Sequence, residues 1–175
     1  MRRIRYSVAM SLDGFIAGPK GEADWIVMDP EIDFSELFSS FDTLVMGRRA
    51  FQDALKRGGD GSMPGMNCFV VSATLRQADH PNVTILGADF EPKLRQLKAA
   101  PGKDIWLFGG GTLFRSLLAV GLVDAVEVAV VPTLLGEGLP LLPPPARGAK
   151  LKLSNHRHYK TSGILLLEYA VERVS

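Results

Sequence analysis

Two glycine-containing turns combine residue types that bind phosphate groups. In the first, the apolar segment 43–46 ends at Gly47, and Arg48 and Arg49 follow directly. If a helix begins at this glycine, its first turn offers free backbone N–H groups and a partial positive charge. Such a helix start binds phosphate, and an arginine adds a planar, bidentate donor. The alternative is a glycine turn followed by two surface arginines, and this short motif alone does not decide between the two.

The second turn contains three consecutive glycines, Gly109, Gly110 and Gly111, between an apolar segment and a helical one. Glycines have no Cβ, so a ligand can approach their backbone closely. The turn differs from the six-residue dinucleotide fingerprint, because Phe114 stands where that pattern has its last glycine. A purely structural strand-to-helix turn is the alternative, although three glycines in a row cost backbone entropy.

Both turns follow expected strands, and open α/β sheets bind ligands at the C-terminal ends of their strands. A dinucleotide with a pyrophosphate and a further phosphate would use both turns. A third candidate is the loop 9–18, in which Asp13 and Gly14 predict a sharp turn. Gly14 and Gly18 would allow this loop to open and close over a ligand. The alternative is an ordinary surface turn, which the residues alone favour.

The hydrophobic pattern places these motifs in alternating strands and helices. Strands are expected at 4–10, 43–46, 68–71, 83–86, 105–108 and 124–131, and helices at 48–56, 91–100 and 112–120. A further short amphipathic helix is expected after Pro30, with helical spacing of Phe34, Leu37, Phe38 and Phe41. Residues 11–25 and 132–145 are expected to be loops, and 151–158 with 164–171 an antiparallel hairpin. This pattern predicts a single α/β domain over residues 1–175, with three layers: a mostly parallel twisted sheet, helices on both of its faces, and the antiparallel hairpin at one edge.

Composition limits the classes of function. With 175 residues and a formal net charge of +1, the chain has no broad electrostatic attraction to nucleic acid or to an anionic membrane. It has neither a signal-peptide pattern nor an apolar stretch near the roughly 20 residues of a membrane span, so a cytoplasmic location is expected. Cys68 is the single cysteine and does not cluster with His80, His156 or His158 at metal-ligand spacing. We therefore expect no metal site.

Taken in order, these motifs resemble the dihydrofolate reductase superfamily, which includes the reductase domain of bacterial riboflavin biosynthesis (the RibD C-terminal domain). The resemblance covers nearly the whole chain. Residues 9–17 are similar to the family's first strand and mobile nicotinamide loop, and Trp25 to its active-site tryptophan. Residues 45–49 are similar to the helix start that holds the pyrophosphate and the 2′-phosphate. Gly109 and Gly110 resemble the family's glycine pair, which is joined by a cis peptide bond.

The resemblance implies NADPH as the cofactor and direct hydride transfer to a C=N or C=O bond. Ala9 and Ile16 would pack on the nicotinamide, and Arg48 or Arg49 would hold the 2′-phosphate that distinguishes NADPH from NADH. The residues expected to bind the cofactor are Ala9, Ile16, Gly47, Arg48, Arg49, Ser72, Gly109, Gly110, Gly111, Thr112 and Leu113.

The substrate side of the family pattern is less well kept. The residues expected to bind substrate are Met10, Asp13, Trp25, Leu37, Phe38 and Met66, a set that suits a flat heterocycle such as a pterin or a pyrimidine. Met66 stands where dihydrofolate reductases have the arginine that holds the folate carboxylate, and a thioether cannot replace a bidentate donor. Ala50 and Ala129 replace two family threonines, and the Asp-Asp-Pro of the riboflavin branch is absent.

The family's catalytic carboxylate lies a few residues after the tryptophan, where Asp29, Glu31 and Asp33 are all candidates. We prefer Asp33, because Leu37 would follow one helical turn later on the same face. Glu31, which would place Ser35 there, is the second choice. The alternative is that all three are helix N-terminal acids that complement the helix dipole.

Two other functions stay open. A true dihydrofolate reductase would need Lys56 or Arg57 to contact the folate tail. A non-catalytic NADP-binding protein would keep the cofactor site without turnover. The expected partners are a small heterocyclic substrate and a second copy of the chain in a homodimer, because the apolar segment 164–167 is long for a solvent-facing edge strand.

Overall fold

The computed structural model describes residues 1–172. Its elements in chain order are β1 (Ile4–Ser11), β2 (Phe15–Ala17), α1 (Phe34–Ser39), β3 (Phe41–Gly47), α2 (Arg48–Lys56), β4 (Asn67–Val71), η1 (Gln77–Asp79), β5 (Thr84–Leu86), α3 (Phe90–Ala99), β6 (Asp104–Gly109), α4 (Gly111–Ala119), β7 (Ala125–Val131), β8 (Leu139–Pro140), β9 (Leu151–His158) and β10 (Leu165–Val171). Most expected elements are present, with ends that differ by one or two residues.

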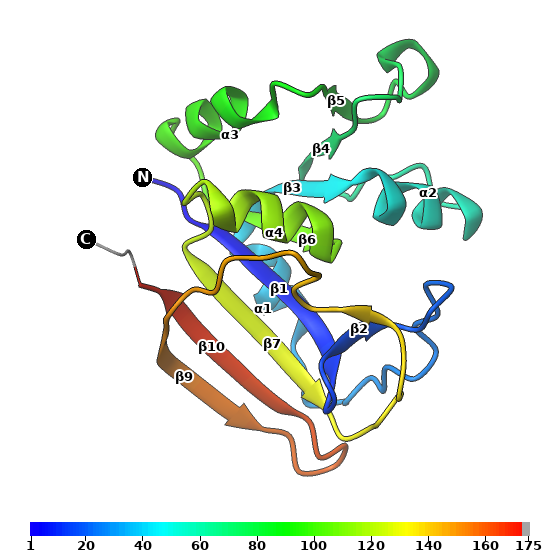
Figure 1. Cartoon of the computed structure of the whole chain (residues 1–175), viewed down its shortest axis with the longest axis vertical. Coiled ribbons are helices and arrows are strands. Elements are labelled where there is room, and N and C mark those ends of the chain that lie inside the picture. The colour runs from blue at the N-terminus through cyan, green and yellow to red at the C-terminus, as the bar shows by residue number, and fades with distance from the viewer. Residues whose placement is uncertain (173–175) are drawn as a thin grey trace.

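Eight strands form one sheet in the order β5-β4-β3-β6-β1-β7-β10-β9 (Figure 1). The six strands from β5 to β7 run parallel to one another, and β1 lies between β6 and β7. The hairpin of β9 and β10 joins the sheet beside β7, with β10 antiparallel to β7. The predicted fold class, a mostly parallel sheet with an antiparallel C-terminal hairpin, is confirmed.

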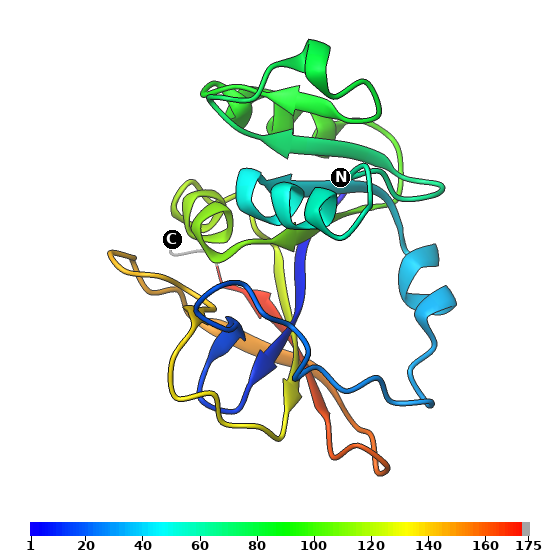
Figure 2. The same cartoon turned by 90° about the vertical axis from the view of Figure 1, so that its right-hand side faces the viewer.

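Helices cover both faces of the sheet. Ile4 and Tyr6 of β1 point into a core that includes Leu94 of α3 and Leu117 of α4. Leu44 and Met46 of β3 point to the other face, where Phe51 of α2 packs against them and Leu37 of α1 joins the same cluster. Figures 1 and 2 show α4 and α1 on opposite sides of β1. Because side chains alternate along a strand, central strands such as β3 and β6 contribute to both cores, with Val45 and Leu107 on one face and Leu44 and Trp106 on the other.

The helix expected after Pro30 is shorter than its apolar spacing predicted. It begins at Phe34, after Asp33, whose carboxylate caps it by accepting a hydrogen bond from the Glu36 N–H (3.0 Å). It ends at Ser39, and Phe41 belongs to β3, with its ring 5.6 Å from the Trp106 ring. Packing of Phe41 against a neighbouring strand therefore overrides its helical spacing to Phe34 and Phe38.

The two segments expected to be loops contain a second, two-stranded sheet, formed by β2 and β8. Gly138, just before β8, has a φ of +154°, and a Cβ there would lie 2.3 Å from the Ala17 carbonyl oxygen. Asp13 fastens the same two segments, because its carboxylate accepts hydrogen bonds from the N–H groups of Leu135 and Gly136 (3.1 and 2.7 Å). Contacts between segments about 120 residues apart leave no local pattern in the sequence.

Within residues 1–172, no helix is both long and apolar enough to cross a bilayer. The same residues contain no group of three or more His, Cys, Asp and Glu side chains that could hold a metal ion. Cys68 is buried in β4, and burial raises the pKa of its thiol. Its environment is therefore that of a small core residue.

Candidate active site

The two glycine turns lie side by side. β3 and β6 are neighbours in the sheet, with Met46 opposite Gly109. Gly47 and Gly110 are the N-cap residues of α2 and α4. A Cβ on Gly47 would lie 3.8 Å from both the Gly109 carbonyl oxygen and the Gly110 nitrogen. Two helix N-termini, each with free N–H groups and a partial positive charge, therefore meet at the C-terminal edge of the sheet.

The three consecutive glycines have different surroundings. Gly109, with a φ of +150°, and Gly110 are joined by a cis peptide bond, and an added Cβ on either would meet no atom within 4 Å. Gly111 is different, because its Cβ would lie 2.7 Å from the Pro140 carbonyl oxygen. Gly109 and Gly110 thus leave open space for a ligand, whereas Gly111 is required by packing against β8. Thr112 is exposed in the first turn of α4, and Leu113 points into the core.

The arginines after Gly47 are exposed at this edge. Arg48 reaches towards the next strand end, where its Nη1 donates a hydrogen bond to Thr74 Oγ1 (3.0 Å). Ser72 organises that turn, because its hydroxyl oxygen accepts from the N–H groups of Thr74 and Leu75 (3.2 and 3.1 Å). Arg49 makes no hydrogen bond or ion pair with any residue in the range 1–172. The edge therefore combines two helix starts with two accessible guanidinium groups.

A cavity of about 490 Å³ lies on the face of the sheet that α1 covers. Its floor is formed by two rows of side chains that cross four strands, β1, β7, β10 and β9. One row is polar and consists of Ser7, Glu127, Glu168 and Asn155. The next row is mostly apolar and consists of Ala9, Ala129, Leu166 and Arg157. The two alanines, which lie side by side on β1 and β7, leave room for a flat ring.

The roof of the cavity is α1 and the segment that leads into it. Leu37 and Phe38, two of the residues expected to bind substrate, line it together with Ile26, Ile32 and Phe34. Asp33 also lines the cavity, from its position as the N-cap of α1. The roof is therefore mostly apolar, with two carboxylates, Asp33 and Glu36, in its lining.

The three candidate acids lie in different environments. Asp29 is 3% exposed and accepts hydrogen bonds from the N–H groups of Glu31 and Ser162 (both 2.8 Å), which ties the roof to the turn between β9 and β10. The hydrogen bonds from Ser162 and Glu31 hold the pKa of Asp29 below its usual value, against the opposing effect of burial. Glu31 is exposed and does not line the cavity. Of the three, Asp33 is the carboxylate that faces it.

The other residues expected to bind substrate lie outside the cavity lining. Met10 is next to Ala9 in β1 and points to the opposite face, where it packs on the core under α4. Met66 packs in the core beside α2. Trp25 packs against the cluster of Val131, Tyr159 and Ile164, and its Nε1 donates to the Glu22 carbonyl (3.1 Å). Asp13 fastens the two loops, as described above, and hydrogen bonds from Ser11 and Gly136 lower its pKa.

Among the predicted cofactor residues on the first strands, Ala9 lies in the cavity floor and Ile16 is half-buried in β2. The two basic residues considered for a folate tail have other roles. Lys56 pairs with Asp53 (3.2 Å), and Arg57 donates to the Gly21 carbonyl (3.4 Å). Neither residue lines the cavity.

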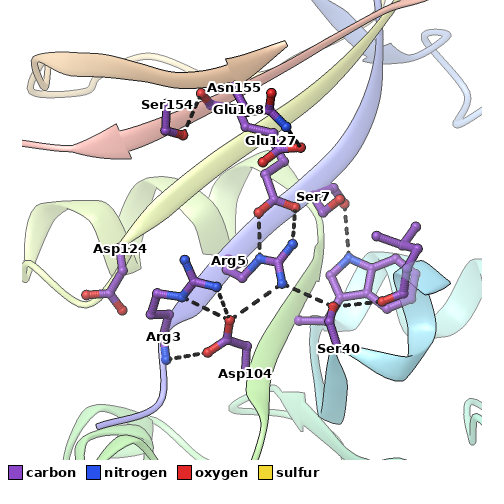
Figure 3. Close-up of polar contacts among 12 residues, drawn as sticks. Arg3, Arg5, Ser7, Ser40, Asp104, Asp124, Glu127, Ser154, Asn155 and Glu168 are labelled. Atoms are coloured by element: carbon purple, nitrogen blue, oxygen red, sulfur yellow. Dashed lines mark hydrogen bonds and ion pairs between the residues drawn. The ribbon is translucent and has the colours of Figure 1, made fainter. Parts of the chain in front are cut away.

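The charged groups in the cavity floor were not predicted from the sequence. Arg5 is paired with Glu127 through two hydrogen bonds, Nε to Oε1 (2.5 Å) and Nη2 to Oε2 (3.0 Å) (Figure 3). Nη1 of Arg5 also donates to Ser40 Oγ (3.1 Å) and lies 3.5 Å from an Asp104 oxygen. The available signal was the presence of single charged residues within two otherwise apolar strands, at Arg5 and at Glu127.

The order of the strands, the two glycine turns and the cavity floored by alanines together define a fold of the dihydrofolate reductase class. Dihydrofolate reductase from Enterococcus faecalis, solved in complex with NADP(H) and RAB-propyl, superposes with a TM-score of 0.68 at 15% identity, over 98% of this chain and 97% of that chain. At that identity the similarity establishes the fold alone.

The sequence comparisons identify a family, which is more specific than the fold. The model of the RibD C-terminal domain matches residues 2–165, and the chain belongs to that family. Protein YyaP of Bacillus subtilis is 34% identical over 179 residues, which cover 96% of this chain and 94% of YyaP. A putative riboflavin biosynthesis protein from Shewanella sp. PV-4 has a TM-score of 0.81 at 26% identity, over 99% of this chain and 100% of that chain.

A bifunctional protein from Thermotoga maritima shares the fold, with a TM-score of 0.72 at 18% identity. It is a diaminohydroxyphosphoribosylaminopyrimidine deaminase and 5-amino-6-(5-phosphoribosylamino)uracil reductase, and the match covers 98% of this chain and 57% of that protein. The resemblance inferred from the sequence is confirmed for the RibD C-terminal family and for the dihydrofolate reductase-like fold.

Proposed function

We propose that this protein is an NADPH-dependent reductase that transfers a hydride to a C=N or C=O bond of a pyrimidine- or pterin-type heterocycle. The observation that carries the proposal is the meeting of the Gly47 and Gly110 helix starts beside a cavity floored by Ala9 and Ala129. Family membership supports a reductase of this type. Nicotinamide cofactors supply the hydride in such enzymes, and the protein contributes position and charge.

The residues at the sheet edge fit a dinucleotide phosphate. The backbone at Gly109 and Gly110 is open, and the first turns of α2 and α4 present N–H groups to the same region. The pyrophosphate would lie between Gly47 and the N–H groups of Gly111, Thr112 and Leu113. Arg48 and Arg49, with Ser72 nearby, would hold the 2′-phosphate.

On the cavity side, Ala9 and Ile16 would flank the nicotinamide, and the substrate ring would lie over Ala9 and Ala129 under Leu37 and Phe38. Asp33 would donate or relay the proton to the reduced bond. Its position at the cavity edge, as the acid of its segment that faces the lining, supports this role. As the N-cap of α1, its carboxylate is also held in one orientation by the Glu36 N–H.

Turnover is tested by following NADPH absorbance with a panel of pyrimidines and pterins, including dihydrofolate. We expect oxidation with at least one pyrimidine or pterin, and a strong loss of kcat in Asp33→Asn, because asparagine keeps the helix cap but cannot donate a carboxyl proton. Glu31→Gln is the matched control and should keep full activity. Tight NADPH binding without turnover of any heterocycle would instead support a non-catalytic NADP-binding protein.

We also propose a cytoplasmic homodimer. β9 is exposed along its whole length at the edge of the sheet, and Leu153 and Leu165 are 49% and 37% exposed on β9 and β10. Open edge strands invite pairing with another chain. Sedimentation should show a dimer that Leu153→Lys weakens, and a wild-type monomer at high concentration would contradict the proposal.

A further inference from the structure

The cavity carries an excess of negative charge. Its lining contains four carboxylates and two guanidinium groups, namely Asp33, Glu36, Glu127, Glu168, Arg5 and Arg157. Both oxygens of Glu127 accept from Arg5, so these two charges largely neutralise each other. A cleft with an excess of one sign disfavours ligands of the same sign. The cavity is therefore unsuited to an anionic substituent at its acidic end.

The acidic end is the polar row of the floor. Glu168 of β10 lies directly opposite Glu127 of β7 in the antiparallel register, with Ser7 and Asn155 on either side (Figure 3). Because Glu127 is paired with Arg5, Glu168 is the carboxylate of this row that no cation neutralises within residues 1–172. A hydrogen-bond donor from a ligand, placed above Glu168, would stabilise its charge.

The polar row offers an unused carboxylate acceptor at Glu168. Glu168 Oε1 accepts from Asn155 Nδ2 (3.2 Å), and Oε2 makes no hydrogen bond within residues 1–172. Two nearby donors already have partners, since Trp106 Nε1 donates to the Ser7 carbonyl (3.0 Å) and Arg5 donates to Glu127 and Ser40. A ligand that pairs with Glu168 Oε2 must bring an N–H or O–H group.

The alanine row and the polar row are two residues apart along each strand, which is roughly 6.6 Å. Both rows line the same cavity, so the Glu168 side chain can extend towards a substituent of a ring that lies over Ala129. We propose that Glu168 selects the substrate. The position of the ring in this argument rests on the proposed function. The substrate is a heterocycle with an amino or hydroxyl substituent at this end, without phosphate or carboxylate there.

Two pyrimidines that differ only at position 6 test this inference, namely 6-aminouracil and orotate, which is uracil 6-carboxylate. Their dissociation constants are measured by calorimetric or NMR titration of the whole protein. We expect 6-aminouracil to bind at least about tenfold more tightly than orotate, because the carboxylate of orotate would meet the negative charge of Glu168. In Glu168→Gln the preference should fall several-fold. Gln keeps the Oε1 acceptor for Asn155, so the floor should stay folded.

Glu91→Gln, on the exposed face of α3, is the matched control and should keep the wild-type preference. Equal or tighter binding of orotate by the wild type would overturn the proposal. A preference that Glu168→Gln leaves unchanged would overturn the assignment to Glu168, and so would the failure of both pyrimidines to bind. NADPH binding, titrated in the same samples, reports on the proposed cofactor site separately from either result.

Discussion

The sheet edge and the cavity floor differ in both construction and charge. The edge is built from backbone, where Gly47 and Gly110 begin two helices, and its exposed side chains Arg48 and Arg49 are cationic. The floor is built from side chains of four strands, and the lining of the cavity as a whole contains four carboxylates and two guanidinium groups. Under the proposed function, the edge would favour a polyanionic cofactor and the cavity an uncharged substrate, because the charges of opposite sign are held by different parts of the fold.

The largest effect should come from breaking the cavity floor. Arg5→Ala leaves the buried Glu127 without its bidentate partner, and removing one partner of a buried ion pair typically costs about 3–5 kcal/mol. Lys56→Ala, which removes the exposed pair with Asp53, should change stability by less than about 0.5 kcal/mol. Urea unfolding measures both, and similar losses in the two variants would show that the Arg5–Glu127 pair is not a structural part of the floor.

The glycines of the edge should separate packing from ligand binding. Gly111→Ala places a Cβ 2.7 Å from the Pro140 carbonyl oxygen, and overpacking of this kind costs about 1–3 kcal/mol of stability. Gly47→Ala makes only ordinary contacts, the nearest at 3.6 Å to Leu113 Cβ, so its melting temperature should change little. Its Cβ narrows the space between the two turns, and we expect NADPH affinity to fall. Unchanged NADPH affinity in Gly47→Ala would place the phosphates elsewhere.

Charge at the edge should control the choice of cofactor. Arg49→Ala removes a guanidinium that has no partner within residues 1–172, and we expect about a tenfold loss of NADPH affinity with little change for NADH. Arg57→Ala, at the other end of α2, is the control and should leave both affinities unchanged. An equal loss for both nucleotides in Arg49→Ala would assign this arginine to the pyrophosphate.

The smallest effect concerns the roof of the cavity under acidic conditions. The pKa of Asp29 is lowered in the folded protein, so the stabilisation it provides is present above its unfolded pKa of about 3.9 and is lost as the pH falls through the lower folded pKa. Asp29→Asn should therefore be less sensitive to acid than the wild type between about pH 5 and pH 2. Asp24→Asn is the control and should keep the wild-type dependence of stability on pH. Identical acid profiles for Asp29→Asn and the wild type would show that the ionised Asp29 carboxylate does not stabilise the roof.

The two regions also differ in how far the sequence predicts them. The edge follows from short local patterns, since a glycine after an apolar strand and before a helix was enough to place Gly47 and Gly110. The cavity floor depends on register between distant strands, and Ser7, Glu127, Glu168 and Asn155 come together from four of them. Met10 was assigned to the substrate on the basis of the family motif, but alternation along β1 allows Ala9 or Met10 to face the cavity, not both. Phe41 left its expected helix because Trp106, on another strand, offered a better packing partner.

Thermal unfolding with NADPH, with NADH and without nucleotide tests the central claim most directly. A ligand present at 100 times its dissociation constant stabilises a protein by about 2.7 kcal/mol, which is readily seen as a rise in melting temperature. The account predicts a clear rise with NADPH, a smaller one with NADH, and loss of this difference when Arg48 and Arg49 are both replaced by alanine. No rise with either nucleotide would contradict the cofactor site at the Gly47 and Gly110 helix starts, and with it the assignment as a reductase.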